Sequence, residues 1–189
     1  MKRILGIGLY LICLTMLNAC KSSEPDSVDR AQEQNAQAAI DKKISEFLTE
    51  AADGRMMGIE QGKVAKTHSQ SIEIKKYGEW MIEDQTKLLR DIKALAGAKK
   101  ITLPLTLSHQ KADGLSDLKE KQGKDFDEKF IKMMIIDHKR DVRAFKAARD
   151  FQDLDIQQFA TRYLPIIESH LSEIKTLKQA ELHGTLSKK

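Results

Sequence analysis

Apolar side chains recur every three to four residues through FIKMMIIDHKRDVRAF, residues 130–145, and this period predicts an amphipathic helix. A histidine, His138, falls on the apolar stripe, with Asp137 directly before it and Asp141 one turn beyond it. A polar side chain in an apolar interior costs free energy unless it has a partner. Other helices of the fold therefore have to supply a partner for His138. The stripe consists of Phe130, Met134, His138, Val142 and Phe145.

The same period recurs in other parts of the chain, and glycine and proline are scarce, with 10 and 3 residues. We expect an all-α fold in which four long helices form an antiparallel bundle of ferritin-like type. The stretch ITLPLTL, residues 101–107, and a short helix over 108–121 form a long crossover between helices 2 and 3. The four long helices are expected at 40–67, 71–95, 125–150 and 154–180.

The first 20 residues, MKRILGIGLYLICLTMLNAC, have a basic start, an apolar run and small residues before a cysteine. This pattern predicts a signal peptide over residues 1–19, because the apolar run is too short for a transmembrane helix. The end of the run, Leu17 to Cys20, resembles a bacterial lipobox, in which the signal is cut before a cysteine that then carries acyl chains. The alternative is an ordinary secreted protein.

The lipobox leads to a prediction of location. Cys20 would be lipidated, and several acyl chains give lasting attachment to a membrane. We expect a bacterial cell-envelope protein, anchored in the outer membrane and facing the periplasm. Residues 20–38 lack apolar periodicity and are expected to be a flexible tether, followed by the bundle domain at 39–183 and a tail at 184–189.

The charge balance bears on partners. When Lys2 and Arg3 leave with the signal, the 32 basic side chains fall to 30, against 28 acidic ones. Proteins that bind nucleic acid usually have a clear basic excess, so we expect no nucleic-acid partner. The expected partner is the membrane, through the lipid anchor at Cys20, and the sequence identifies no protein partner.

Each predicted long helix places a polar residue on its apolar stripe, and bundle interiors build metal sites from such facing side chains. Two imidazoles with carboxylates suit zinc, iron or manganese. The alternative is a polar network in which Asp84 and Glu60 accept hydrogen bonds from the two histidines and fix the helix register. The candidate metal ligands are Glu60, Asp84, His138, Asp141, His170 and Glu173.

Several other chemistries find little or no support in the sequence. A di-iron oxidase site needs Glu-x-x-His on two helices, and no histidine of this chain has a glutamate three residues before it. No catalytic triad or phosphate-binding glycine loop is recognisable. Methionines on three predicted helices include Met57, Met81 and Met134 and could bind copper(I), but methionine at helical spacing is mostly core filler.

Five blocks resemble, in order, those of a bacterial envelope family known as domain-of-unknown-function family 4142. They include YGEWMIEDQTKLLRDIKALA, ITLPLTLS and FDEKFIKMMIIDHKRDVRAFKAA. The resemblance implies a ferritin-like fold and a secreted or lipid-anchored location, without an established activity. One position departs from the family pattern, because Gln85 stands where the family commonly has histidine.

No reaction can be derived from these patterns, so two functions of different classes stay open. The first is a non-catalytic binding or envelope-stability module, which the sequence favours. The second is a metal-binding bundle that uses Glu60, Asp84, His138 and His170.

Overall fold

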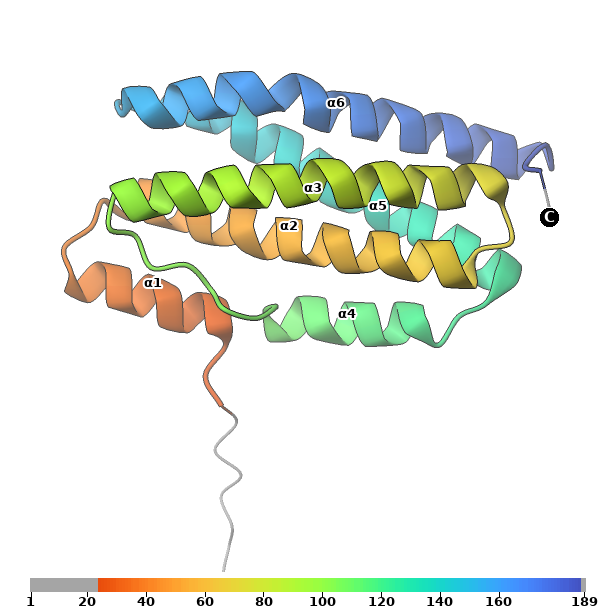
Figure 1. The fold of residues 1–189 in the computed structure, drawn as a ribbon, viewed down its shortest axis with the longest axis horizontal. Coiled ribbons are helices and arrows are strands. Elements are labelled where there is room, and N and C mark those ends of the chain that lie inside the picture. Colours follow the sequence, from red (N-terminus) through yellow and green to blue (C-terminus); the bar gives the residue numbers. More distant parts are fainter. Residues whose placement is uncertain (1–23, 188–189) are drawn as a thin grey trace, which may run out of the picture.

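The structure, a computed structural model, describes residues 24–187 (Figure 1). Within this range the chain forms six helices and no strand, which confirms the all-α prediction. The predicted signal peptide and the predicted lipidation at Cys20 lie outside the described residues.

Four long helices and a crossover make up most of the molecule. α2 (Lys42–His68) and α3 (Ile72–Ala98) run antiparallel, and the crossover carries the chain back along their length (Figure 1). α5 (Gly123–Ala148) and α6 (Leu154–Leu182) form a second antiparallel pair. The crossover contains the short helix α4, His109–Lys119. The expected helices agree with the observed ones to within three residues at every end.

Side-chain caps explain where three of these helices begin. The carboxylates of Asp41 and Asp153 accept hydrogen bonds from backbone N–H groups three residues later, at 3.0 and 3.1 Å. Ser71 accepts one from the Ile74 N–H at 3.2 Å. Each cap satisfies a donor that the first helical turn leaves free.

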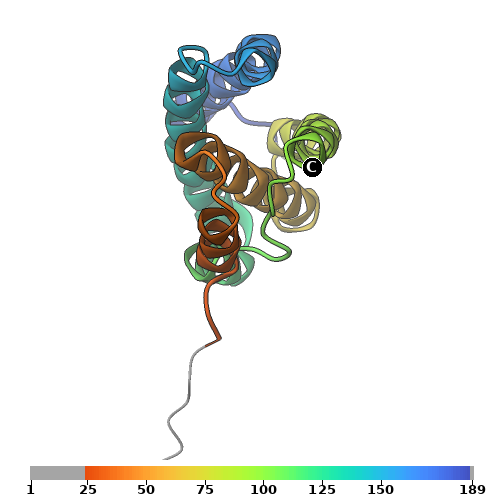
Figure 2. The same ribbon diagram turned by 90° about the vertical axis from the view of Figure 1, so that its left-hand side faces the viewer.

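A sixth helix, α1 at Ser27–Gln37, occupies much of the stretch expected to be a flexible tether, so that expectation was wrong there. Asp26 caps it by accepting from the Val28 N–H at 2.8 Å. Asn35 exchanges two hydrogen bonds with the backbone of Thr102 in the crossover, at 2.9 and 2.7 Å. The helix is stabilised by polar contacts with a distant segment, which apolar periodicity does not reveal. α1 and α4 lie along one face of the long helices, beside α2 (Figures 1 and 2).

Glycines let α2 and α3 approach closely. A Cβ atom built on Gly62 would lie 2.6 Å from the carbonyl oxygen of Gly78, and one on Gly78 would lie 2.9 Å from that of Gly62. No side chain fits between the two backbones at this point. α2 nevertheless continues unbroken through Gly54, Gly58 and Gly62.

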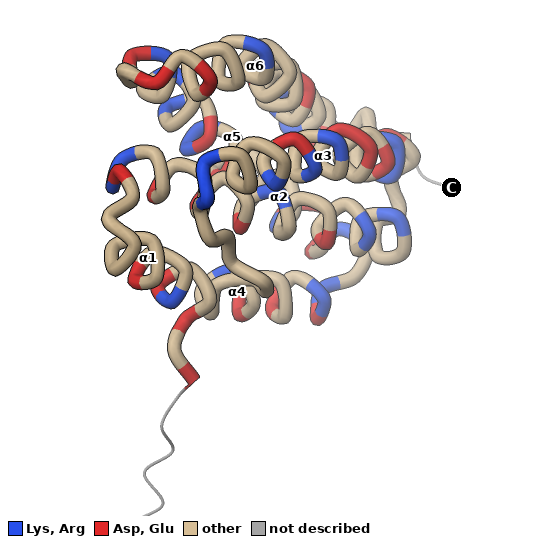
Figure 3. The backbone as a smooth tube through the Cα atoms, turned by 60° about the vertical axis from the view of Figure 1, so that its left-hand side comes forward, with Lys and Arg blue, Asp and Glu red and all other residues tan. Residues whose placement is uncertain are grey.

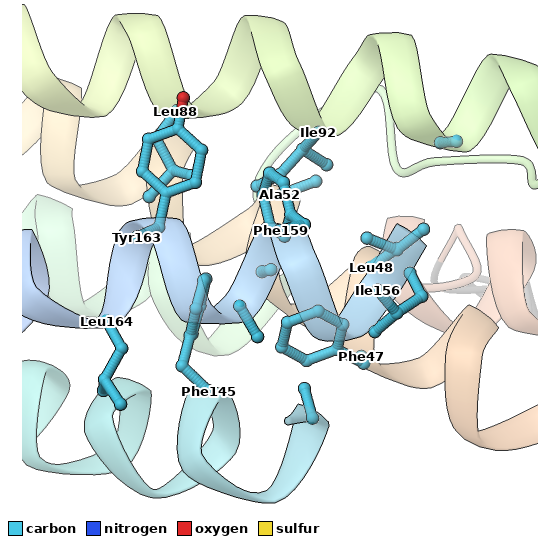
Figure 4. Close-up of a cluster of buried hydrophobic side chains, with 14 of the residues drawn as sticks. Phe47, Leu48, Ala52, Leu88, Ile92, Phe145, Ile156, Phe159, Tyr163 and Leu164 are labelled. Carbon is cyan, nitrogen blue, oxygen red and sulfur yellow. The ribbon is translucent and has the colours of Figure 1, made fainter. Parts of the chain in front are cut away.

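The apolar core has two separate clusters, one toward each end of the long helices. The first, here the aromatic cluster, lies where α2 and α6 begin and contains Phe47, Phe145, Phe159 and Tyr163 (Figure 4). The second lies toward the opposite end and contains Tyr77, Phe126, Phe130 and Met134. On the outside, acidic and basic residues are interspersed over all the helices (Figure 3).

Candidate functional site

Between the two apolar clusters, each long helix contributes at least one polar side chain at a similar position along the bundle. We call this group the polar layer. All but Asp84 and Asp141 are almost fully buried. The layer consists of Arg55 on α2, Asp84 and Gln85 on α3, His138 and Asp141 on α5, and His170 on α6.

His170 is completely buried and has a partner for each ring nitrogen. Nε2 lies 2.8 Å from a carboxylate oxygen of Asp84, and Nδ1 lies 3.3 Å from the amide nitrogen of Gln85. An ionised carboxylate only accepts, so Nε2 carries the proton and Nδ1 accepts from Gln85. Burial lowers the pKa of His170, while the hydrogen bond to Asp84 raises it in part. The imidazole is therefore neutral at pH 7.

His138 is 2% exposed, and its ring centroid lies 5.5 Å from that of His170. Nδ1 lies 2.8 Å from the carbonyl oxygen of Met134, one turn earlier on α5. Because a carbonyl can only accept, Nδ1 carries the proton and Nε2 has an unprotonated lone pair. Burial lowers the pKa of His138 to about 4, although the negative charge of Asp141 opposes this shift. His138 is therefore also neutral at pH 7.

Arg55 is the charged residue of the layer that the sequence analysis missed. Its side chain is 2% exposed, and its Nη2 group donates to the carboxylate of Asp141 across the α2–α5 interface. A buried charge needs such a partner, because desolvation without one costs several kcal/mol. A signal was available in the sequence: Arg55 follows Leu48, Ala51 and Ala52 at helical spacing, so it continues the apolar stripe of α2.

Several buried polar atoms of the layer have no partner within the described part of the protein. They are Nε and Nη1 of Arg55, Oε1 of Gln85 and Nε2 of His138. These three side chains line one small cavity between α2, α3 and α5, to which Lys111 of α4 also contributes. Met57, Met81 and Met134 are among its apolar walls. The cavity has a water-accessible volume of about 10 Å³, so no organic substrate fits inside it.

The structure brings together four of the six candidate metal ligands and separates the other two. Asp84 and His170 are hydrogen-bonded to each other, and the His138 ring lies next to that of His170. Asp141 forms a salt bridge with Arg55. Glu60 was wrongly placed on the inner face of its helix, and the candidate ligand Glu173 lies away from the layer. The Glu60 carboxylate pairs with Lys63 at 2.7 Å, and Glu173 is exposed on α6. Within residues 24–187, no three His, Cys, Asp or Glu side chains are placed to hold a metal ion.

The expected polar network is present in part. His170 has its predicted partner Asp84, but His138 bonds to the Met134 carbonyl and not to Glu60. The buried polar residue of α3 is Gln85, which is 1% exposed. Asp84 is only half-buried, at the edge of the layer. The sequence analysis placed Asp84 on the inner face because neighbouring positions on a helix differ by only part of a turn.

Among the larger hollows on the surface are two that lie away from the polar layer's imidazoles. One, of about 510 Å³, lies between α1 and the crossover, and the other, of about 490 Å³, lies between α2 and α5 beside Phe47 and Phe145. Neither is lined by His138 or His170. Over the part of the chain that the structure describes, no helix combines the length and apolar character needed to span a membrane.

The fold and site together define a class: an all-helical protein whose four long helices enclose a layer of polar side chains. The model of the family described as Domain of unknown function (DUF4142) matches residues 29–177. The chain therefore belongs to this family, as the sequence resemblance predicted. Neither the curated proteins nor the solved structures yield a match.

Proposed function

We propose that this protein is a lipid-anchored module of the bacterial cell envelope, facing the periplasm, that acts by binding or by stabilising the envelope and not by catalysis. Its helical domain is proposed to be of ferritin-like type, because two antiparallel helix pairs are joined by a crossover that returns along the bundle. The proposed location in the envelope rests on the signal-like segment that ends at Cys20.

The observation that carries the non-catalytic part of the proposal is the closed polar layer. Its two imidazoles are neutral and buried, and its two charged residues, Arg55 and Asp141, pair with each other across two helices. The adjoining cavity of about 10 Å³ is too small for an organic substrate. A layer of this kind fixes the register of helices, as buried polar groups do in other bundles. Recognition of a partner is then left to the outer surface.

Metabolic labelling with a palmitate analogue tests the anchor. The wild type is expected to be labelled, and Cys20→Ser is expected to lose the label. Cys13→Ser is the matched control, because Cys13 lies within the segment expected to be removed and should leave labelling intact. An unlabelled wild type, or a labelled Cys20→Ser variant, would contradict the anchored location.

A second experiment tests the role in the envelope. Deletion of the gene is expected to sensitise cells to detergent or osmotic stress, and the anchored protein should restore resistance. A form with a cleavable secretory signal and no lipidated cysteine should fail to do so. Full rescue by that soluble form would count against a role that depends on the membrane, while the labelling result would still stand.

The alternative function is a divalent-metal site, and the proximity of Asp84, His170 and His138 favours it. Arg55 opposes it, because its positive charge lies close enough to lower the pKa of both imidazoles. Metal analysis of protein purified without chelators decides whether the metal site exists. One equivalent of zinc, iron or manganese, lost in His138→Ala plus His170→Ala, would establish the metal site and contradict the proposal that the polar layer only fixes the helix register; substoichiometric metal in both samples would exclude the metal site.

A further inference from the structure

We infer that the cavity in the polar layer is a binding site for one water molecule, which links Arg55, Gln85 and His138 and completes the interior of the bundle. The argument starts from the directions of the hydrogen bonds around this cavity. Four of the five buried side-chain atoms without a partner in residues 24–187 belong to these three residues. The fifth belongs to Asp127, which does not line this cavity.

The orientation of the Gln85 amide follows from Asp84. Because Asp84 accepts from Nε2 of His170, the Nδ1 atom of that ring presents a lone pair, which calls for a donor. Gln85 must therefore turn its NH₂ group toward Nδ1, at 3.3 Å. Its Oε1 atom is then left as an acceptor without a partner.

The remaining groups have equally defined roles. His138 donates from Nδ1 to the Met134 carbonyl, so its unpartnered Nε2 atom is an acceptor. Arg55 donates from Nη2 to Asp141, and its Nε and Nη1 groups are donors that have no partner. The three side chains thus present two acceptors and two donor groups, all of them buried.

A water molecule has the complementary set of two donors and two acceptor lone pairs. It would donate to Nε2 of His138 and Oε1 of Gln85 and accept from the guanidinium of Arg55. The volume of about 10 Å³ suits a single water, and buried waters usually make two to four hydrogen bonds to groups that otherwise lack partners. Leaving these groups unpartnered in a dry interior would be costly.

Ions fit the same cavity less well. A cation would face the guanidinium of Arg55, although His138 and the thioethers of Met57, Met81 and Met134 are chemically suited to copper(I). An anion would find Lys111 and Arg140 in the lining as well as Arg55, but it would also face two acceptor atoms, Oε1 of Gln85 and Nε2 of His138, to which it cannot donate. Only a neutral molecule that both donates and accepts satisfies all three side chains. The water joins α2, α3 and α5 directly and reaches α6 through the bond of Gln85 to His170.

A crystal structure of the wild-type protein, purified without added metal and measured with anomalous data at the copper edge, tests the site. The expected result is one peak without anomalous signal, about 2.7–3.2 Å from Gln85 Oε1, His138 Nε2 and an Arg55 nitrogen. An empty cavity would overturn the inference. A peak with a copper anomalous signal, or a chloride ion, would also overturn it.

NMR in solution tests the same site without a crystal. Nitrogen spectra should show His138 protonated on Nδ1 and His170 on Nε2, and the His138 ring should show a cross-relaxation signal to a long-lived water. Gln85→Met, which removes the acceptor Oε1, should weaken or abolish the water signal. Gln61→Met is the matched control, because Gln61 is buried and lines the cavity, but its amide nitrogen donates to Asp137 and neither of its side-chain polar atoms is among the buried atoms without a partner. The opposite His138 tautomer, or equal effects of the two variants, would contradict the site.

Discussion

The aromatic cluster and the polar layer are neighbouring parts of one interior, but their stabilities have different origins. In the aromatic cluster, the ring of Phe145 packs edge-on against Phe47 and tilted against Phe159, with centroid distances of 5.1 and 6.0 Å (Figure 4). Burial of this apolar surface stabilises the fold. In the polar layer, desolvation of Arg55, Asp141 and two imidazoles offsets much of what their contacts contribute. The cluster therefore supplies stability, while the layer disfavours helix alignments that would leave its buried polar groups without partners.

The largest effect is expected in the aromatic cluster. Phe145→Ala should lower the free energy of unfolding by about 5 kcal/mol, because it removes a fully buried ring and leaves a cavity. Denaturant titration followed by circular dichroism measures the loss. Leu154→Ala, at an exposed leucine of α6, is the control and should change stability little. A small loss in Phe145→Ala would mean that this end of the bundle does not dominate stability.

In the polar layer, breaking the charged pair should have a strong effect that a second substitution relieves. Asp141→Leu leaves Arg55 charged and without its carboxylate, which should cost about 4 kcal/mol. The double variant Arg55→Met with Asp141→Leu should be far closer to the wild type, because both charges are gone. Additive losses in this double-mutant cycle, measured by the same titration, would show that the two residues do not depend on each other.

Acid should lower the free energy of unfolding through the polar layer. The folded-state pKa of His138 is about 4, against an ordinary value of 6.5, so the unfolded chain binds a proton that the folded chain excludes. Stability from this group is complete above pH 6.5 and is lost as the pH falls toward 4, by about 3 kcal/mol in all. As the pH is lowered through this range, the free energy of unfolding should fall less steeply in His138→Gln than in the wild type. Identical slopes for both proteins would refute the assignment.

A single hydrogen-bonding side chain of the layer should matter less. Gln85→Met is expected to cost about 1–2 kcal/mol, because it removes the donor to His170 and the acceptor that faces the cavity. Thermal unfolding measures the change, with Gln61→Met as the buried control on α2. A larger loss in the control would place the important amide at Gln61.

The smallest effect is expected at Glu60, which the sequence placed in the interior. Its carboxylate pairs with Lys63 at the surface, so Glu60→Gln should change stability by no more than about 0.5 kcal/mol. Asp84→Asn, which alters the partner of His170, should have a clearly larger effect. Equal losses of stability in Glu60→Gln and Asp84→Asn would indicate that Glu60 is part of the polar layer.

Much of the fold could be predicted because helical periodicity is a local property of the chain. The stripe that contains Phe130, His138 and Phe145 is buried as expected, and capping residues define several helix starts. The N-terminal helix α1 could not be found in this way, because it depends on hydrogen bonds between Asn35 and Thr102, which are 67 residues apart.

The sequence by itself determined that this chain forms long amphipathic helices, and that histidines on two of them face the interior. Only the tertiary structure decided which polar groups meet there. It selected Gln85 and Arg55 for the interior and left Glu60 and Glu173 outside. The physical reason is that the rotation and spacing of each helix are set by packing against its neighbours, such as the close approach of Gly62 to Gly78. A small rotation decides whether a residue at the edge of a stripe is buried or exposed.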